Sequence, residues 1–182
     1  WKRRGRPVPP PHVVKQRMLK AYSTRFGLKT LVETGTCYGN MVEALKDSFD
    51  HIYSIELSEE LFEKAKERFA DIRNVEIIHG DSAVELGKLM HKINEPALFW
   101  LDAHYSAGVT AKGNKITPVY EELAHILNAP DRRHVIIIDD ARDFGLNPAY
   151  PTIEELRNLV KSKRQNLEVN VWDDSIRITP KQ

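Results

Sequence analysis

Apolar residues in this chain occur in short runs that alternate with longer stretches of helical spacing. A short apolar run bounded by turn residues predicts a strand, and apolar positions that recur every three or four residues predict a helix. A first helix is expected over residues 12–25, closed by Gly27. Strands are expected at residues 31–32, 51–56, 75–78, 96–101, 134–138 and 167–172, with helices between them.

The last strands differ in their pattern. Residues 135–138 are uninterruptedly apolar, which predicts a central parallel strand buried on both faces. Residues 167–172 alternate between apolar and polar, as in an edge or antiparallel strand, and a turn at 173–175 precedes a second alternating run. The pattern therefore predicts an α/β fold: a three-layer, Rossmann-like arrangement around a seven-stranded, mostly parallel sheet with a C-terminal antiparallel hairpin.

The length of 182 residues fits one domain. Residues 1–11 differ from the rest of the chain, because they hold four basic residues and four prolines. This composition predicts an extended, semi-rigid arm. The arm is either a solvated tail or a basic segment that reaches over the active site or a partner. Residues 12–182 are expected to form the single domain. A lysine or arginine of the first helix, Lys15 or Arg17, is a candidate to face the cleft.

Composition narrows the function only slightly. Hydrophobic residues make up 41% and charged residues 29%, as in an ordinary globular protein. The formal net charge of +1 gives no reason to expect general nucleic-acid or membrane binding, and no apolar run approaches the roughly 18 residues of a membrane span. The single cysteine, Cys37, excludes an intramolecular disulfide, so we expect a cytoplasmic protein.

The turn between the first strand and the next helix carries the main chemical signal. Its pattern is Glu33-x-Gly35-x-x-x-Gly39, and a strand, a tight glycine turn and a helix in this order typically bind a nucleotide. A dinucleotide fingerprint would have a third glycine, and a carboxylate at the turn would repel a phosphate but suit a cation. The alternative is a strand–turn–helix unit without a cofactor role.

Two further acidic positions extend this signal. Glu56 ends the second strand, 23 residues after Glu33, at about the distance where a carboxylate can accept hydrogen bonds from a ribose diol. Asp81 and Ser82 follow the third strand, where either can cap the next helix. The alternatives are that Glu56 is only a solvated strand end and that Asp81 only caps the helix.

The glycine turn resembles motif I of the class I S-adenosylmethionine-dependent methyltransferases, and the element order over about residues 28–180 resembles their seven-stranded sheet. In that family the acidic turn faces the methionine part of the cofactor, and a carboxylate near Asp81 contacts the adenine amino group. The resemblance implies cofactor contacts from Glu33, Thr34, Gly35, Thr36, Tyr38, Gly39, Glu56, Leu57, Asp81, Ser82 and Asp102.

Three aspartates follow the fourth and fifth strands. Asp102, Asp139 and Asp140 each come after a strongly apolar run, and the carboxyl ends of neighbouring parallel strands meet at one edge of a sheet. Three close carboxylates repel one another unless a cation or proton lies among them, and hard oxygen ligands suit Mg²⁺ or Ca²⁺, or else Mn²⁺. The alternative is that Asp139 or Asp140 only caps a loop and that His104 only hydrogen-bonds locally.

This arrangement resembles the divalent-metal-dependent O-methyltransferases, and more closely the macrocin and novobiocin sugar O-methyltransferase group, which has Asp-Gly-Asp after strand four. Here Ala103 replaces the glycine and His104 stands at the position of the proposed base. A neutral imidazole can accept a hydroxyl proton near neutral pH. The resemblance therefore implies Asp102 and His104 as catalytic residues, with Asp102, Asp139 and Asp140 as metal ligands.

Two polar loops are expected to border the same crevice. The first, residues 105–117, offers Tyr105, Ser106, Thr110 and Lys112 to a substrate; the second, residues 141–152, offers Arg142, Asp143, Tyr150 and Pro151. Both can instead be ordinary surface loops. Thr117 is a candidate N-cap for the helix that follows, with Pro118 in its first turn.

Together these features predict an S-adenosylmethionine-dependent methyltransferase that uses a divalent cation, Mg²⁺ by preference, to assist O-methylation of a hydroxyl on a small molecule or glycosyl group. No Asn-Pro-Pro-Tyr-type motif follows strand four, which argues against N-methylation of bases, and the net charge of +1 gives no reason to expect nucleic acid as a partner. The alternatives are a non-catalytic S-adenosylmethionine-binding module and another Rossmann-like nucleotide-dependent enzyme. The oligomeric state stays open.

Overall fold

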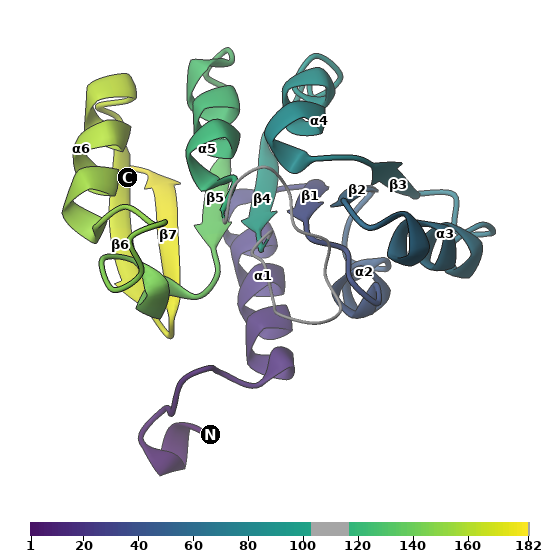
Figure 1. Cartoon of the computed structure of the whole chain (residues 1–182), viewed down its shortest axis with the longest axis horizontal. Helices are drawn as coiled ribbons and strands as arrows, with labels where there is room; N and C mark the ends of the chain where they lie inside the picture. Colours follow the sequence, from purple (N-terminus) through teal and green to yellow (C-terminus); the bar gives the residue numbers. More distant parts are fainter. Residues whose placement is uncertain (103–116, 182) are drawn as a thin grey trace.

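The computed structural model describes residues 1–102 and 117–181 and places them in three layers around one sheet (Figure 1). The strand order is β3-β2-β1-β4-β5-β7-β6, with all neighbours parallel except β7, which runs antiparallel to β5 and β6. This is the three-layer, Rossmann-like arrangement that the sequence predicts. The strands are β1 (Thr30–Thr34), β2 (His51–Glu56), β3 (Val75–His79), β4 (Ala97–Leu101), β5 (Val135–Ile138), β6 (Leu167–Trp172) and β7 (Ser175–Pro180).

Helices cover both faces of the sheet. On one face, α1, α2 and α3 bury an apolar cluster with alternate residues of the strands, and on the other α4, α5 and α6 bury a second, larger cluster (Figure 1). The helical segments are η1 (Lys2–Arg4), α1 (His12–Phe26), α2 (Asn40–Leu45), α3 (Glu59–Arg68), α4 (Ser82–Leu89), α5 (Val119–Asn128), η2 (Ala141–Asp143) and α6 (Ile153–Lys163).

Local chemistry sets several helix ends. The Ser58 hydroxyl accepts from the backbone N–H of Leu61 and starts α3, and Gly27 ends α1 in the left-handed region at φ 65°. Thr152 opens α6 with a capping box. The prediction for α5 differs by one residue: Pro118 takes the N-cap position, and the Thr117 hydroxyl accepts from Val119 N–H.

The strand predictions are confirmed. The apolar strand β5 is fully buried between β4 and β7, whereas the alternating strand β6 lies at the sheet edge with mostly exposed residues. A fully buried strand needs apolar residues on both faces, and an edge strand needs them on one. No helix in the described part of the chain is long and apolar enough to cross a membrane.

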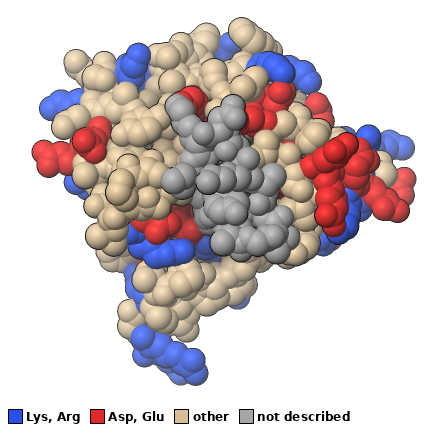
Figure 2. All heavy atoms as spheres, viewed as in Figure 1, with Lys and Arg blue, Asp and Glu red and all other residues tan. Residues whose placement is uncertain are grey.

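The N-terminal arm contacts the C-terminal hairpin. The Arg6 guanidinium donates to Asp173 Oδ1 at 3.0 Å and lies 4.8 Å from the centre of the Trp172 ring. The preceding basic residues of η1 are exposed, and basic side chains mark the tip of the arm in the space-filling view (Figure 2). The arm is thus held to the turn between β6 and β7 through one arginine.

Candidate active site at the carboxyl ends of the strands

The candidate site lies where the strand order reverses. β1 pairs with β2 on one side and with β4 on the other, so the chain leaves the sheet in opposite directions at this point. Ligands of open α/β sheets bind in the crevice beyond such a switch point. Five of the predicted acidic residues lie at the carboxyl ends of β1, β2, β4 and β5: Glu33, Glu56, Asp102, Asp139 and Asp140. The sixth, Asp81, follows β3.

The glycine turn after β1 is built around a buried carboxyl group. Glu33 is 2% exposed, and its Oε2 accepts from the Ser54 hydroxyl at 2.6 Å; that hydroxyl lies 2.7 Å from the hydroxyl of Thr36. Burial first, and then the nearby charges of Asp102 and Glu56, raise the pKa of Glu33 to about 8. The side chain is therefore mostly neutral at pH 7 and would ionise readily beside a cationic ligand.

Glu56 holds two turns together. Its Oε2 accepts from the backbone N–H of Cys37 at 2.7 Å and its Oε1 from that of Ser58 at 2.9 Å. The side chain is 4% exposed. A carboxylate has about four lone-pair sites, so two remain for other donors. Glu56 thus links the glycine turn to the start of α3, and the predicted contact with a ribose stays a prediction.

The other predicted cofactor residues lie around these two. Asp81 caps α4, because its Oδ1 accepts from Ala83 N–H at 2.9 Å, and Ser82 is buried behind it. Thr34 is fully buried at the end of β1, and Leu57 is half-buried after β2. Tyr38 is 55% exposed and so lies on the surface of the turn. Gly35 and Gly39 both adopt positive φ, at 86° and 71°, as the tight turn requires.

The three predicted metal ligands do converge. One carboxylate oxygen from each of Asp102, Asp139 and Asp140 lies within 4.8 Å of the others. The pairing of β4 with β5 produces this, since Asp139 N–H donates to Leu101 O at 3.0 Å. Asp140 adopts left-handed backbone geometry at φ 54°, which aspartate tolerates better than most residues. We call these three residues the aspartate triad.

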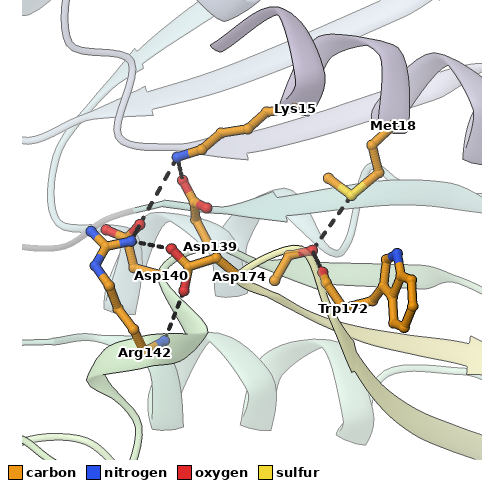
Figure 3. A network of polar contacts seen from close by, with 8 residues as sticks. Lys15, Met18, Asp139, Asp140, Arg142, Trp172 and Asp174 are labelled. Atoms are coloured by element: carbon orange, nitrogen blue, oxygen red, sulfur yellow. Dashed lines mark hydrogen bonds and ion pairs between the residues drawn. The ribbon is translucent and has the colours of Figure 1, made fainter. Parts of the chain in front are cut away.

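Two cations from other elements already contact the triad (Figure 3). The Lys15 ammonium of α1 forms an ion pair with Asp139 Oδ2 and lies 3.9 Å from Asp140 Oδ1. The Arg142 guanidinium of η2 lies 2.7 Å from Asp140 Oδ1 and also pairs with Asp174 of the hairpin turn. Within the described ranges, these two cations thus face four carboxyl groups, those of the triad and of Asp174.

Burial and charge act in opposite directions on the central ion pair. Burial lowers the pKa of Lys15, but the carboxylates of Asp139, Asp102 and Asp140 outweigh this and raise it. Burial and the charge of Asp102 raise the pKa of Asp139, although the Lys15 ammonium acts to lower it. Lys15 was one of two candidates on the first helix; the other, Arg17, is exposed.

Sequence reasoning missed Glu122. It is 1% exposed on α5 and lines the cleft with Asp102, Thr117 and Tyr150. Burial raises its pKa to about 7, although hydrogen bonds with Ser82 and Thr34 act to lower it, and its Oε1 has no hydrogen-bond partner among the residues that the structure describes. The signal was present: Glu122 lies on the apolar stripe of its helix, three residues after Val119.

Several predicted residues lie outside the described part of the chain: His104, Tyr105, Ser106, Thr110 and Lys112. The second loop is described. Its Tyr150 lines the cleft beside the triad, and its Arg142 contacts Asp140. The expectation that this loop faces the crevice is therefore confirmed for Tyr150.

Comparison with solved structures places the fold among methyltransferases. The O-methyltransferase of Bacillus cereus in complex with SAH is 17% identical, with a TM-score of 0.66 over 99% of this chain and 86% of that one. TomG, an O-methyltransferase of Streptomyces achromogenes in complex with SAM, is 17% identical, with a TM-score of 0.65 over 91% and 78%. A putative rRNA methylase from Clostridium thermocellum is 12% identical, with a TM-score of 0.64 over 90% and 96%.

No family model matches the chain, and no curated protein matches it. The comparison thus rests on the solved structures alone, and their similarity shows the class I methyltransferase fold.

Proposed function

We propose that this protein is an S-adenosylmethionine-dependent methyltransferase that methylates a hydroxyl group with the help of a divalent cation. The observation that carries the proposal is the convergence of the aspartate triad beside the glycine turn, at the switch point of a methyltransferase fold. Solved structures of this fold include O-methyltransferases in complex with SAM or SAH.

The cofactor half of the proposal depends on Glu33 and Glu56. The methionine end of S-adenosylmethionine carries an ammonium and a sulfonium, and Glu33 is a buried carboxyl group at the turn that would face them. Glu56 would accept hydrogen bonds from the ribose hydroxyls through its remaining lone pairs. Thr34, Thr36, Tyr38, Leu57, Asp81, Ser82 and Asp102 would complete the contacts.

The metal half depends on the triad. Three carboxylate oxygens within 4.8 Å of one another match the hard ligands that Mg²⁺ prefers, and nitrogen or sulfur ligands that zinc would favour do not occur among the triad. A bound divalent cation lowers the pKa of a hydroxyl that it contacts. The residues present therefore fit the ion.

The chain's own residues would align the acceptor and remove its proton. In the transfer, the acceptor oxygen would form a bond to the methyl carbon of S-adenosylmethionine. The bond between that carbon and sulfur would break, and the electron pair of the broken bond would stay on sulfur. The hydroxyl proton goes to a base, for which His104 is our candidate from the sequence. Tyr150 lines the cleft and would contact the acceptor there.

The acceptor class is the finest part of the proposal. A small molecule or a glycosyl group is our choice, because the aspartate pattern resembles that of the sugar O-methyltransferases. The same fold also occurs in proteins described as rRNA methylases, so an RNA acceptor is the competing candidate. The net charge of +1 favours the small acceptor, because RNA binding usually needs a basic surface.

The test is calorimetric titration of metal-stripped protein, first with S-adenosylhomocysteine and then with Mg²⁺. We expect micromolar cofactor binding, and Mg²⁺ binding that is lost in Asp139→Ala but kept in the matched control Asp47→Ala, because Asp47 is exposed in the turn after α2. Stabilisation by NAD rather than by S-adenosylhomocysteine would instead indicate another Rossmann-like enzyme. Cofactor binding without turnover on any hydroxyl acceptor would indicate a binding module.

A further inference from the structure

The Lys15 ammonium lies against the aspartate triad. Its Nζ contacts Asp139 directly and lies 3.9 Å from Asp140, so it faces two of the three carboxylates of the triad. The side chain is 15% exposed, and Nζ lies 5.9 Å from the centre of the buried Trp100 ring. The ammonium is therefore inside the acidic site and largely shielded from water.

The helix that carries Lys15 is fixed independently of this ion pair. Leu19, one turn later on α1, is fully buried among apolar residues of β1 and α2. Met18 contacts the Ser175 hydroxyl at 3.5 Å on the β6–β7 side (Figure 3). Lys15 can thus leave the triad by a change of side-chain rotamer while α1 stays in place.

We infer that Lys15 is a built-in competitor for the divalent cation. In the metal-free protein its ammonium neutralises Asp139 and holds the triad together; a divalent ion binds after Nζ has left Asp139. This inference rests on the metal half of the proposed function. It concerns the role of Lys15 in tuning that site, which neither the fold nor the sequence pattern assigns.

The physical reason is that two cations cannot share the same carboxylates at low cost. An ammonium and a divalent ion a few ångströms apart repel strongly where water is largely excluded. Lys15 also takes up lone pairs of Asp139 that the metal would use. Coupling between two such binding events typically changes affinity by about 5- to 150-fold, so we expect removal of the Lys15 charge to tighten Mg²⁺ binding about tenfold or more.

The first experiment compares Mg²⁺ binding by calorimetry in wild-type protein, Lys15→Met, Lys15→Arg and Lys20→Met. Methionine keeps the length and helix propensity of lysine without its charge. Lys20 lies on the same helix with an exposed side chain, so Lys20→Met is the matched control. We expect tighter binding in Lys15→Met alone, and near wild-type affinity in the other two.

Equal or weaker Mg²⁺ binding in Lys15→Met would overturn the inference, because Lys15 would then not compete with the metal. If neither wild-type protein nor Lys15→Met bound Mg²⁺ while both bound S-adenosylhomocysteine, the inference and the metal half of the proposed function would fall together, and the cofactor half would stand. Tighter Mg²⁺ binding in all lysine variants would also refute a specific role of Lys15.

The second experiment uses wild-type protein and so does not depend on the folding of a variant. Limited acetylation followed by peptide mass spectrometry reports the reactivity of Lys15 relative to Lys20, with and without Mg²⁺. The ion pair and burial suppress Lys15 in the metal-free protein. We expect Mg²⁺ to raise its relative reactivity several-fold; an unchanged or lower reactivity at saturating Mg²⁺ would contradict displacement.

Discussion

Replacement of Glu33 by glutamine should change how stability depends on pH. The folded state raises the pKa of Glu33 from 4.5 to about 8, mainly through burial. Between these values the folded chain keeps a proton at this site and the unfolded chain releases it. Stability from this group is therefore complete below pH 4.5 and is lost as the pH rises toward 8.

The magnitude follows from the width of that window. One pKa unit corresponds to about 1.4 kcal/mol. Between pH 4.5 and about 8, the free energy of unfolding therefore falls by at most about 5 kcal/mol through this group. Glutamine has the shape of the neutral acid and can accept from the Ser54 hydroxyl, but it does not titrate. Wild-type stability should thus fall relative to Glu33→Gln by about 1.4 kcal/mol per pH unit between pH 5 and 7.5.

The assay is urea denaturation followed by tryptophan fluorescence at pH 5, 6, 7 and 7.5 in metal-free buffer. Glu67→Gln is the matched control, because it makes the same substitution at an exposed position on α3. Parallel stability curves for wild-type protein and Glu33→Gln would refute the reasoning. They would mean that Glu33 is ionised in the folded state throughout this range.

Three further substitutions test the supporting structure. Gly39→Ala should destabilise the fold by about 1–3 kcal/mol, because φ is 71° and a Cβ would lie 2.6 Å from the Phe69 ring; chemical denaturation measures this, and a neutral result would show that the turn relaxes. Thr152→Ala removes the capping box of α6 and should cost about 1 kcal/mol in the same assay, with no effect on cofactor affinity. Arg6→Ala breaks a partly exposed ion pair with Asp173 and should cost less than about 1 kcal/mol, yet it should speed proteolysis of the arm; unchanged cleavage would show that other contacts hold the arm.

Much of the fold was readable from local sequence patterns. The buried strand β5 and the edge strand β6 differ in the period of their apolar residues, and the glycine turn after β1 requires positive φ that few residues other than glycine adopt. These features depend on residues close together in the chain. The acidic residues of the site were found for the same reason, since each follows a recognisable strand.

The contacts of those acidic residues were harder to predict. Glu56 accepts two backbone N–H groups, which the sequence did not predict, whereas Asp81 caps α4, as the sequence had allowed. Glu122 escaped prediction because a glutamate on a helix is usually exposed. Only the packing of α5 against α4 and the strands shows that this one is buried beside Ser82.

The sequence by itself determined the order of strands and helices, the glycine turn and the types of residue at the strand ends, because sterics and hydrophobic periodicity act over a few residues. The tertiary structure alone decided which charges meet. Lys15 reaches Asp139 across 124 positions of the chain, and Arg142 joins Asp140 to Asp174 of the hairpin. Such pairs form only when the sheet and α1 have packed, because the burial that strengthens them does not exist in any local segment.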